Sequence, residues 1–500
     1  MMKYVSTRGF GPMAFTDILL EGLAPDGGLY VPETYPQLSE ADLSWLTEIL
    51  INEGYAKFAA VILSLFVDDI PFGDLEQMAR RAYTKEKFGT DLIAPVTRLE
   101  PNLWLARLSQ GPTAAFKDMA MQVLGQFFDY ELTRRDQTMT ILGATSGDTG
   151  SAAEFALLDA NRVQVFMLSP LGRMTPFQRG QMYGINTPRI VNITVPGSFD
   201  DCQDLVKEVN ADSEFKKRYS IGAVNSINWA RLVSQVVYYI SSWAQVSHGG
   251  EVSFTVPSGN FGNICAGHVA RMMGVPIKQL VCATNENNVL AEFFSTGVYR
   301  IRASTETFVT SSPSMDISKA SNFERFFFDL TGRDHAAIAK LFGEQLPGTG
   351  VIDIRQQPYA GDVTRRYGFA TGVSTHSDRV ATIADVYRRD NTLIDPHTAD
   401  GVKVARERMG AEPMIALETA LPVKFGSITR EAIGKVPEMP ERFAQVLDSE
   451  QHTVMCDQGA EQLKQIIERL SILVPPPGGS LTWKNGASSS SAPRKDGLMP

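Results

Sequence analysis

The feature that most constrains the fold of this chain is an alternation of apolar and amphipathic segments that begins at Met139. Short runs of β-branched and apolar residues are followed by turns and then by amphipathic stretches. Strands are expected in the segments "MTILGATSG", "VQVFML", "VSFTVPSGNFG" and "QLVCAT", with helices over about 149–158 and in "TPFQRGQMYG". Strands that alternate with helices predict an α/β fold with a largely parallel sheet.

The 500 residues divide into three predicted parts. Residues 1–94 are more helical and carry little strand signal, whereas residues 95–472 hold the alternating segments and form an α/β region of two subdomains. Residues 473–500 are rich in Pro, Gly and Ser, which predicts a disordered tail without a core. The run "FAAVILSLFV" from Phe58 is only about half a membrane span and predicts a core helix.

Composition excludes several classes of function. The net charge of −9 and the lack of a long basic run argue against a protein that binds nucleic acid or an anionic membrane. The four cysteines form no CxxC pair and the six histidines form no HExxH motif, so no metal site is expected. The first residues lack the apolar stretch of a signal peptide, and we expect a cytoplasmic protein with reduced thiols.

One lysine lies in an unusual setting. The segment "GPTAAFKDMAMQ" places Lys117 among small and apolar residues. A lysine there could bury its stem and leave its ammonium in water. Alternatively, desolvation could lower its pKa and free an amine that attacks a carbonyl. The lysine alone leaves both interpretations open.

A first turn has the features of an anion site. In "VSFTVPSGNFGNICAGHVARMM" a glycine-containing turn joins a strand to a helix. Unpaired donors and the helix dipole converge at such a helix start. The backbone N–H groups expected to point outward belong to Gly259, Asn260, Phe261, Gly262 and Asn263. The turn is neither a Walker A sequence nor a GxGxxG fingerprint, and a plain strand-to-helix turn is the alternative.

The segment "GATSGDTGSAAEFALL" is a second turn of this kind. Thr145, Ser146 and Thr149 add hydroxyls to the amides of Gly147 and Gly150. A helix N-cap needs only one Ser, Thr or Asp, and this segment offers four such residues before Gly150. We therefore expect the turn to bind a second anion, either a carboxylate or a phosphate.

The lysine and the two turns together suit a phosphorylated aldehyde cofactor. The lysine would form an imine, one turn would hold the cofactor phosphate, and the other turn would hold an anionic substrate. This combination is the chemical logic of a pyridoxal 5'-phosphate enzyme.

Longer motifs carry a family resemblance. In chain order they are "YVSTRG", "LAPDGGLYVPE", "AFKDMAMQ", "ATSGDTGSAA", "NSINWARL", "SGNFGN", "PSMDISKASNFERFFF", "DPHTA" and "LETALPVKF". With these motifs the chain resembles the threonine synthases of the longer bacterial and fungal kind. The resemblance covers nearly everything before the tail.

The resemblance implies a fold and a reaction. The family belongs to the tryptophan-synthase-β-like, fold type II pyridoxal phosphate enzymes, so largely parallel sheets and a mainly helical N-terminal region are expected. The implied reaction converts O-phospho-L-homoserine and water to L-threonine and phosphate, the last step of threonine biosynthesis. Whether the protein is a monomer or a homodimer is left open.

The resemblance also assigns residues. Lys117 matches the Schiff-base lysine, and Gly259–Asn263 match the loop that binds the cofactor phosphate. Thr419 in "LETALP" matches the threonine that meets the pyridine nitrogen, although a cap or loop hydroxyl is the alternative. Thr145, Ser146 and Thr149 are expected on a substrate anion. Arg231 in "NSINWARL" is a candidate phosphate clamp, because a guanidinium binds oxyanions bidentately, or else a surface or ion-paired helix arginine.

Four positions depart from the family pattern. Asn263 and Asn288 stand where aspartate is usual, and Leu421 and Val423 lie in a stretch that usually reads "TAHPAKF". These departures bear on cofactor and substrate contacts rather than on the lysine. The main alternative is another pyridoxal phosphate lyase, such as a serine/threonine dehydratase or a lyase for phosphorylated amino alcohols. A catalytically silent binding protein is a second alternative, against which the intact "AFKD" argues.

Overall fold

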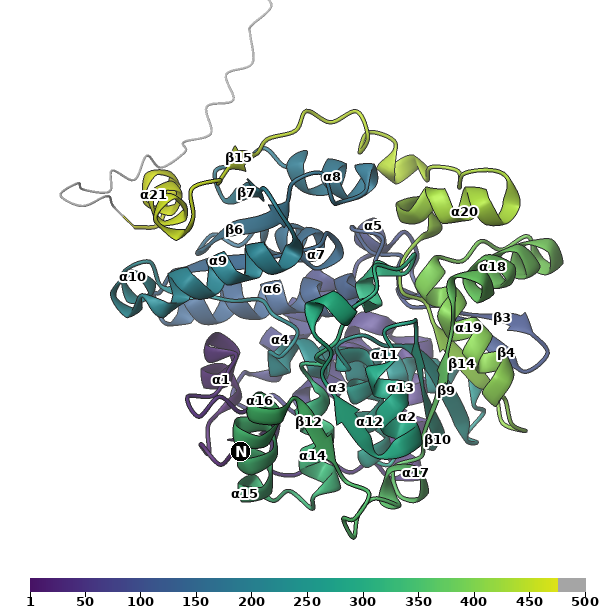
Figure 1. The fold of residues 1–500 in the computed structure, drawn as a ribbon. Coiled ribbons are helices and arrows are strands. Elements are labelled where there is room, and N and C mark those ends of the chain that lie inside the picture. Colours follow the sequence, from purple (N-terminus) through teal and green to yellow (C-terminus); the bar gives the residue numbers. More distant parts are fainter. Residues whose placement is uncertain (475–500) are drawn as a thin grey trace, which may run out of the picture.

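Two largely parallel sheets organise residues 1–474, the part of the chain that the computed structural model describes (Figure 1). The six-stranded sheet has the order β13 Phe369–Val373, β10 Ile277–Thr284, β9 Val252–Pro257, β14 Met414–Leu417, β4 Leu103–Ala106 and β3 Val96–Glu100. The five-stranded sheet has the order β15 Val454–Met455, β7 Ile190–Val195, β6 Val163–Pro170, β5 Met139–Ala144 and β8 Ile221–Gly222. Only β3 runs antiparallel to its neighbour, so the expected α/β fold is confirmed.

The predicted alternation reappears in the five-stranded sheet. The helix α7 Asp148–Leu157 follows β5, and α8 Pro176–Tyr183 follows β6. Every residue of β6 and β7 is buried. Strands of parallel sheets are covered on both faces, which explains why these segments are mainly apolar and β-branched rather than alternating in polarity.

The first part of the chain is mainly helical, as expected. Its helices are α1 Phe15–Glu21, α2 Glu40–Asn52, α3 Tyr55–Ser64, α4 Phe72–Ala82 and α5 Lys85–Phe88, beside a small antiparallel pair of strands, β1 Tyr4–Ser6 and β2 Tyr30–Pro32. The apolar run from Phe58 lies in α3 and is buried. Its side chains share one core with those of α6 Lys117–Arg134 and α11 Trp229–Val246. The boundary after residue 94 stays a prediction.

The other elements complete the layers around the sheets. The helices are α9 Phe199–Ala211, α10 Ser213–Arg218, α12 Gly262–Met272, α13 Val289–Thr296, α14 Phe323–Leu330, α15 His335–Ile338, α16 Leu346–Thr349, α17 Asp362–Arg365, α18 His376–Asp390, α19 Pro396–Arg408, α20 Gly426–Ile433 and α21 Ala460–Leu470. Short 3-10 helices cover Ser304–Glu306, Pro313–Met315, Pro422–Phe425 and Glu441–Phe443, a π-helical turn covers Ala339–Gln345, and β11 Val298–Arg300 pairs with β12 Val351–Asp353.

The described residues contain neither a membrane-spanning helix nor a metal-binding cluster. Between residues 1 and 474, no helix has the length and apolar character needed to cross a membrane. The same part of the chain contains no group of three or more His, Cys, Asp or Glu side chains placed to hold a metal ion. The predicted tail falls, from residue 475 on, outside the described residues.

The helices α6 and α7 approach so closely that one position between them admits only glycine. A Cβ atom at Gly125 in α6 would lie 2.2 Å from the carbonyl oxygen of Ala156 in α7. We expect Gly125→Ala to lower the free energy of unfolding by about 1–3 kcal/mol, because the helices must separate. Urea unfolding measures the change. Gly73→Ala in α4 is the control, since nothing lies within 4 Å of its Cβ position and alanine favours a helix. Equal stability of both variants would contradict the prediction.

Candidate active site

A pocket opens where neighbouring parallel strands of the six-stranded sheet end. The strands β9 and β14 pair directly, and the residues after their carboxyl ends meet the first residues of α6, α11 and α12 there. Ligands of open α/β sheets commonly bind at such an edge. The predicted site residues that line this pocket are Lys117, Arg231, Gly259, Asn260, Phe261, Gly262, Asn263 and Thr419.

Lys117 begins α6, and its side chain is only 13% exposed. Its Nζ lies 3.5 Å from Oδ2 of Asp148. Burial lowers the pKa of the Lys117 ammonium, an effect that the carboxylate of Asp148 opposes and the ammonium of Lys424 reinforces. The side chain thus faces the pocket rather than solvent, and its burial favours a free amine.

The turn after β9 presents unpaired backbone donors to the pocket. Phe261 has a left-handed backbone (φ +66°) that directs the chain into α12. Within residues 1–474 no hydrogen bond leaves the backbone N–H groups of Gly259, Asn260, Phe261 or Asn263. The exception is Gly262, whose N–H donates to Oδ1 of Asn260 over 3.1 Å. Four of the five expected donors are therefore available to an anion at the start of the helix.

Gly259 lies against the neighbouring loop, where a side chain would push the turn out of place. A Cβ atom there would be 2.9 Å from Cγ1 of Ile317 and 3.1 Å from Cα of Met315. We expect Gly259→Val to weaken retention of pyridoxal phosphate by about tenfold or more, since hydrogen bonds to a charged group contribute about 1.5–3 kcal/mol. Dialysis followed by cofactor quantification measures it, with Gly73→Val as the exposed control. A folded Gly259→Val variant with native cofactor affinity would assign the anion site elsewhere.

The second predicted turn lies beside the pocket without lining it. The Thr145 hydroxyl accepts hydrogen bonds from the backbone N–H groups of Gly147 (3.0 Å) and Gly150 (2.8 Å), so it caps its own turn. Ser146 is exposed and Thr149 is half-buried. None of the three hydroxyl residues is among the residues that line the pocket.

Asp148 connects this turn to the pocket, although the sequence interpretation assigned it no role. Its buried carboxylate contacts four side chains: Lys424 (2.8 Å), Lys117 (3.5 Å), Gln178 (3.0 Å) and Ser314 (2.9 Å). Burial alone would raise the pKa of Asp148, but the ammonium of Lys424 and, to a lesser extent, the side chain of Lys117 hold it well below its usual range. Because Asp is common at helix starts, its position in the sequence did not distinguish it from a cap.

Arg231 lies in the first turn of α11 and is only 5% exposed. Its guanidinium makes one hydrogen bond within residues 1–474, from Nη1 to the Val224 carbonyl oxygen over 3.3 Å, and no ion pair with a carboxylate. Burial lowers its pKa to about 10. A buried guanidinium with spare donors beside a pocket is suited to an anionic ligand.

Thr419 follows β14 and is buried at the edge of the pocket. Its backbone is fixed on both sides, because its N–H donates to Oγ1 of Thr398 and its carbonyl accepts from the N–H of Phe116. The Thr419 hydroxyl itself makes no hydrogen bond to any residue between 1 and 474. It is free to meet a ligand, as the resemblance implies.

The departures from the family pattern fit their surroundings. Oδ1 of Asn263 accepts hydrogen bonds from the hydroxyls of Tyr238 (2.6 Å) and Tyr239 (3.0 Å) on α11. Asn288 accepts from the guanidinium of Arg302. The other two positions pack in a small apolar cluster, whose members include Ala114, Phe177, Leu421, Val423 and Phe443. The Asn263 side chain thus stabilises the turn Gly259–Asn263 through hydrogen bonds with uncharged tyrosine hydroxyls.

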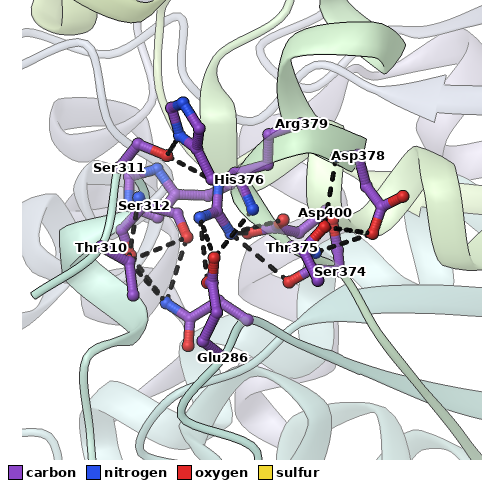
Figure 2. Close-up of polar contacts among 12 residues, drawn as sticks. Glu286, Thr310, Ser311, Ser312, Ser374, Thr375, His376, Asp378, Arg379 and Asp400 are labelled. Atoms are coloured by element: carbon purple, nitrogen blue, oxygen red, sulfur yellow. Dashed lines mark hydrogen bonds and ion pairs between the residues drawn. The ribbon is translucent and has the colours of Figure 1, made fainter. Parts of the chain in front are cut away.

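The loop over the pocket is held by a buried arginine that the sequence did not single out. Figure 2 shows Arg379 of α18 between the carboxylates of Glu286 (2.8 Å) and Asp400 (3.1 Å). Nε of Arg379 also donates to the hydroxyl of Ser311 over 2.8 Å. Burial raises the pKa of Asp400 to about 7, although the positive charge of the Arg379 guanidinium lowers it. This network anchors the segment that brings Ser314 to the pocket.

Comparisons with known proteins agree with this geometry. Family models described as "Threonine synthase N terminus", "Pyridoxal-phosphate dependent enzyme" and "Threonine synthase, C-terminal" match residues 3–83, 89–339 and 398–467. The chain is 60% identical to threonine synthase of Corynebacterium glutamicum over 454 residues, which cover 90% of this chain and 94% of the relative. With threonine synthase of Methylobacillus glycogenes it shares 51% identity over 477 residues, covering 93% of this chain and 99% of the relative.

A solved structure extends the agreement to the whole fold. The pyridoxal-phosphate-bound threonine synthase from Brucella melitensis superposes with a TM-score of 0.89 at 41% identity, covering 94% of this chain and all of that chain. The chain is therefore a pyridoxal phosphate-dependent enzyme and belongs to the threonine synthase family.

Proposed function

We propose that the enzyme acts on O-phospho-L-homoserine, which it converts with water to L-threonine and phosphate. The observation that carries this proposal is Arg231, a buried guanidinium without a carboxylate partner in residues 1–474 that shares its pocket with Lys117. A substrate with only one anionic group would leave this cation unpaired. Burial of an unpaired charge is costly, so a phosphorylated substrate fits the pocket best.

The residues present fit pyridoxal phosphate. The four free N–H groups of the turn after β9 would hold its phosphate, Lys117 would bind its aldehyde carbon, and the Thr419 hydroxyl would meet its ring nitrogen. A neutral hydroxyl leaves that nitrogen largely unprotonated. When bound, the cofactor supplies an electron-withdrawing ring that stabilises negative charge at the substrate Cα.

Lys117 is the proposed proton carrier. Its buried amine would take the Cα and Cβ protons of the substrate and return protons to Cγ and Cα, because an amine at the start of α6 reaches these neighbouring carbons. Water supplies the hydroxyl at Cβ and a proton that the released phosphate takes up. Arg231 would bind the phosphate as it leaves, where negative charge builds in the transition state. Ser146 and Thr149 would contact a substrate anion, while Thr145 shapes their turn through its bonds to Gly147 and Gly150.

One assay separates this proposal from the main alternative. Phosphate release from O-phospho-L-homoserine is measured beside deamination of L-serine on the same preparation. We expect rapid phosphate release with formation of threonine, and slow deamination. Efficient deamination without turnover of the phosphorylated substrate would instead indicate a dehydratase with the same lysine and turns.

A further inference from the structure

A second buried lysine lies next to the proposed cofactor lysine. The side chain of Lys424 is fully buried, and its Nζ donates to the Thr113 carbonyl oxygen over 2.9 Å. The same Nζ lies 2.8 Å from Oδ1 of Asp148, whereas Nζ of Lys117 lies 3.5 Å from Oδ2 of that carboxylate. Two buried amines thus share one carboxylate, and Lys424 makes the shorter contact.

The charges around this cluster disfavour a proton on Lys117. Asp148 and Asp118 are the carboxylates, and burial raises the pKa of Asp118 only to about 6. The positive charge of Arg231 acts on Lys117, and that of Arg442 acts on Asp118. Together with Lys424, these arginines supply three cations for two carboxylates. A proton on Lys117 would add uncompensated positive charge in a buried site.

We propose that Lys424 is a positioning residue whose positive charge, held next to Lys117 on the carboxylate of Asp148, keeps Lys117 an uncharged amine. The inference rests on the proposed function, in which Lys117 binds the cofactor. Attachment joins the Lys117 nitrogen to the aldehyde carbon and releases the aldehyde oxygen as water. It therefore needs the free electron pair of the amine. Without Lys424, the Asp148 carboxylate would stabilise a proton on Lys117 instead.

The experiment measures cofactor attachment as a function of pH. Full-length protein is freed of cofactor with hydroxylamine and mixed with pyridoxal phosphate between pH 6 and pH 10. Borohydride then traps the bond, and mass spectrometry quantifies the Lys117 peptide. We expect Lys424→Met to move the midpoint of the attachment rate upward by about one pH unit or more, since a nearby opposite charge shifts a pKa by about 1–3 units.

Two further variants make the outcome decisive even if Lys424→Met does not fold. Asp148→Asn removes the carboxylate and leaves the Lys424 charge, so the midpoint moves downward. In the Asp148→Asn/Lys424→Met double variant no unpaired carboxylate is buried, and the midpoint rises again relative to Asp148→Asn alone. Equal midpoints in these two variants, or in the native protein and a folded Lys424→Met variant, would overturn the role of Lys424. Cofactor attached to a residue other than Lys117 in the native protein would instead overturn the proposed function.

Discussion

Replacement of Lys117 with alanine is expected to abolish covalent cofactor attachment and to reduce turnover of O-phospho-L-homoserine by at least about a thousandfold. The Nζ of Lys117 faces the pocket between Asp148 and the turn after β9, and no other lysine among residues 1–474 lines that pocket. General acid–base catalysis by one group contributes about a hundredfold to ten-thousandfold, and the same amine also positions the cofactor. Borohydride reduction, peptide mapping and phosphate release measure the two effects.

Control variants distinguish loss of the Lys117 amine from loss of the cofactor site or of the fold. The turn Gly259–Asn263 is intact in Lys117→Ala, so this variant retains the cofactor without a covalent bond. Lys85→Ala on the exposed α5 should behave like the native protein. A label on Lys424 in the native protein would be the most informative contrary result, because Lys424 lies on the other side of Asp148.

The elements that hold the site were predictable because their signals are local. Strands β6 and β9 are buried and rich in apolar and β-branched residues, and each is followed by a turn and a helix. Such a pattern can be recognised within a single stretch of sequence, since both faces of a parallel sheet are covered. The pocket residues Lys117, Gly259 and Thr419 were found by their own motifs and by the family resemblance.

The residues that the sequence did not reveal act through partners distant in the chain. Asp148 meets Lys424, and Arg379 meets Glu286 and Asp400, only because the fold brings separate segments together. A buried ion pair has no periodicity or spacing of its own. Its members look like ordinary helix-start or surface charges until burial is known. Thr145 also acts locally, because its hydroxyl accepts hydrogen bonds within its own turn, and its contact with a ligand stays a prediction.

Replacement of Arg231 with alanine is expected to reduce kcat/KM for O-phospho-L-homoserine by about a hundredfold or more. Removal of one fixed donor from a developing oxyanion typically costs about 2.7–4 kcal/mol. The guanidinium makes a single long hydrogen bond to Val224 within residues 1–474, so its other donors are free to bind the leaving phosphate. Steady-state kinetics measure the loss, and Arg231→Lys should recover part of it because the charge remains without the bidentate geometry.

The Arg231→Ala variant also shows whether Arg231 binds the substrate phosphate or the cofactor phosphate. If Arg231 binds the substrate phosphate, we expect Arg231→Ala to retain the cofactor as the native protein does and to deaminate serine at an unchanged rate. Inorganic phosphate should inhibit this variant more weakly. If Arg231 instead binds the cofactor phosphate, we expect Arg231→Ala to lose pyridoxal phosphate on dialysis. Turnover of O-phospho-L-homoserine and deamination of serine should then fall equally. The free N–H groups of Gly259, Asn260, Phe261 and Asn263 already supply donors for one phosphate, which favours the first outcome. Near-normal turnover by Arg231→Ala would contradict both roles and leave its buried guanidinium a purely structural group.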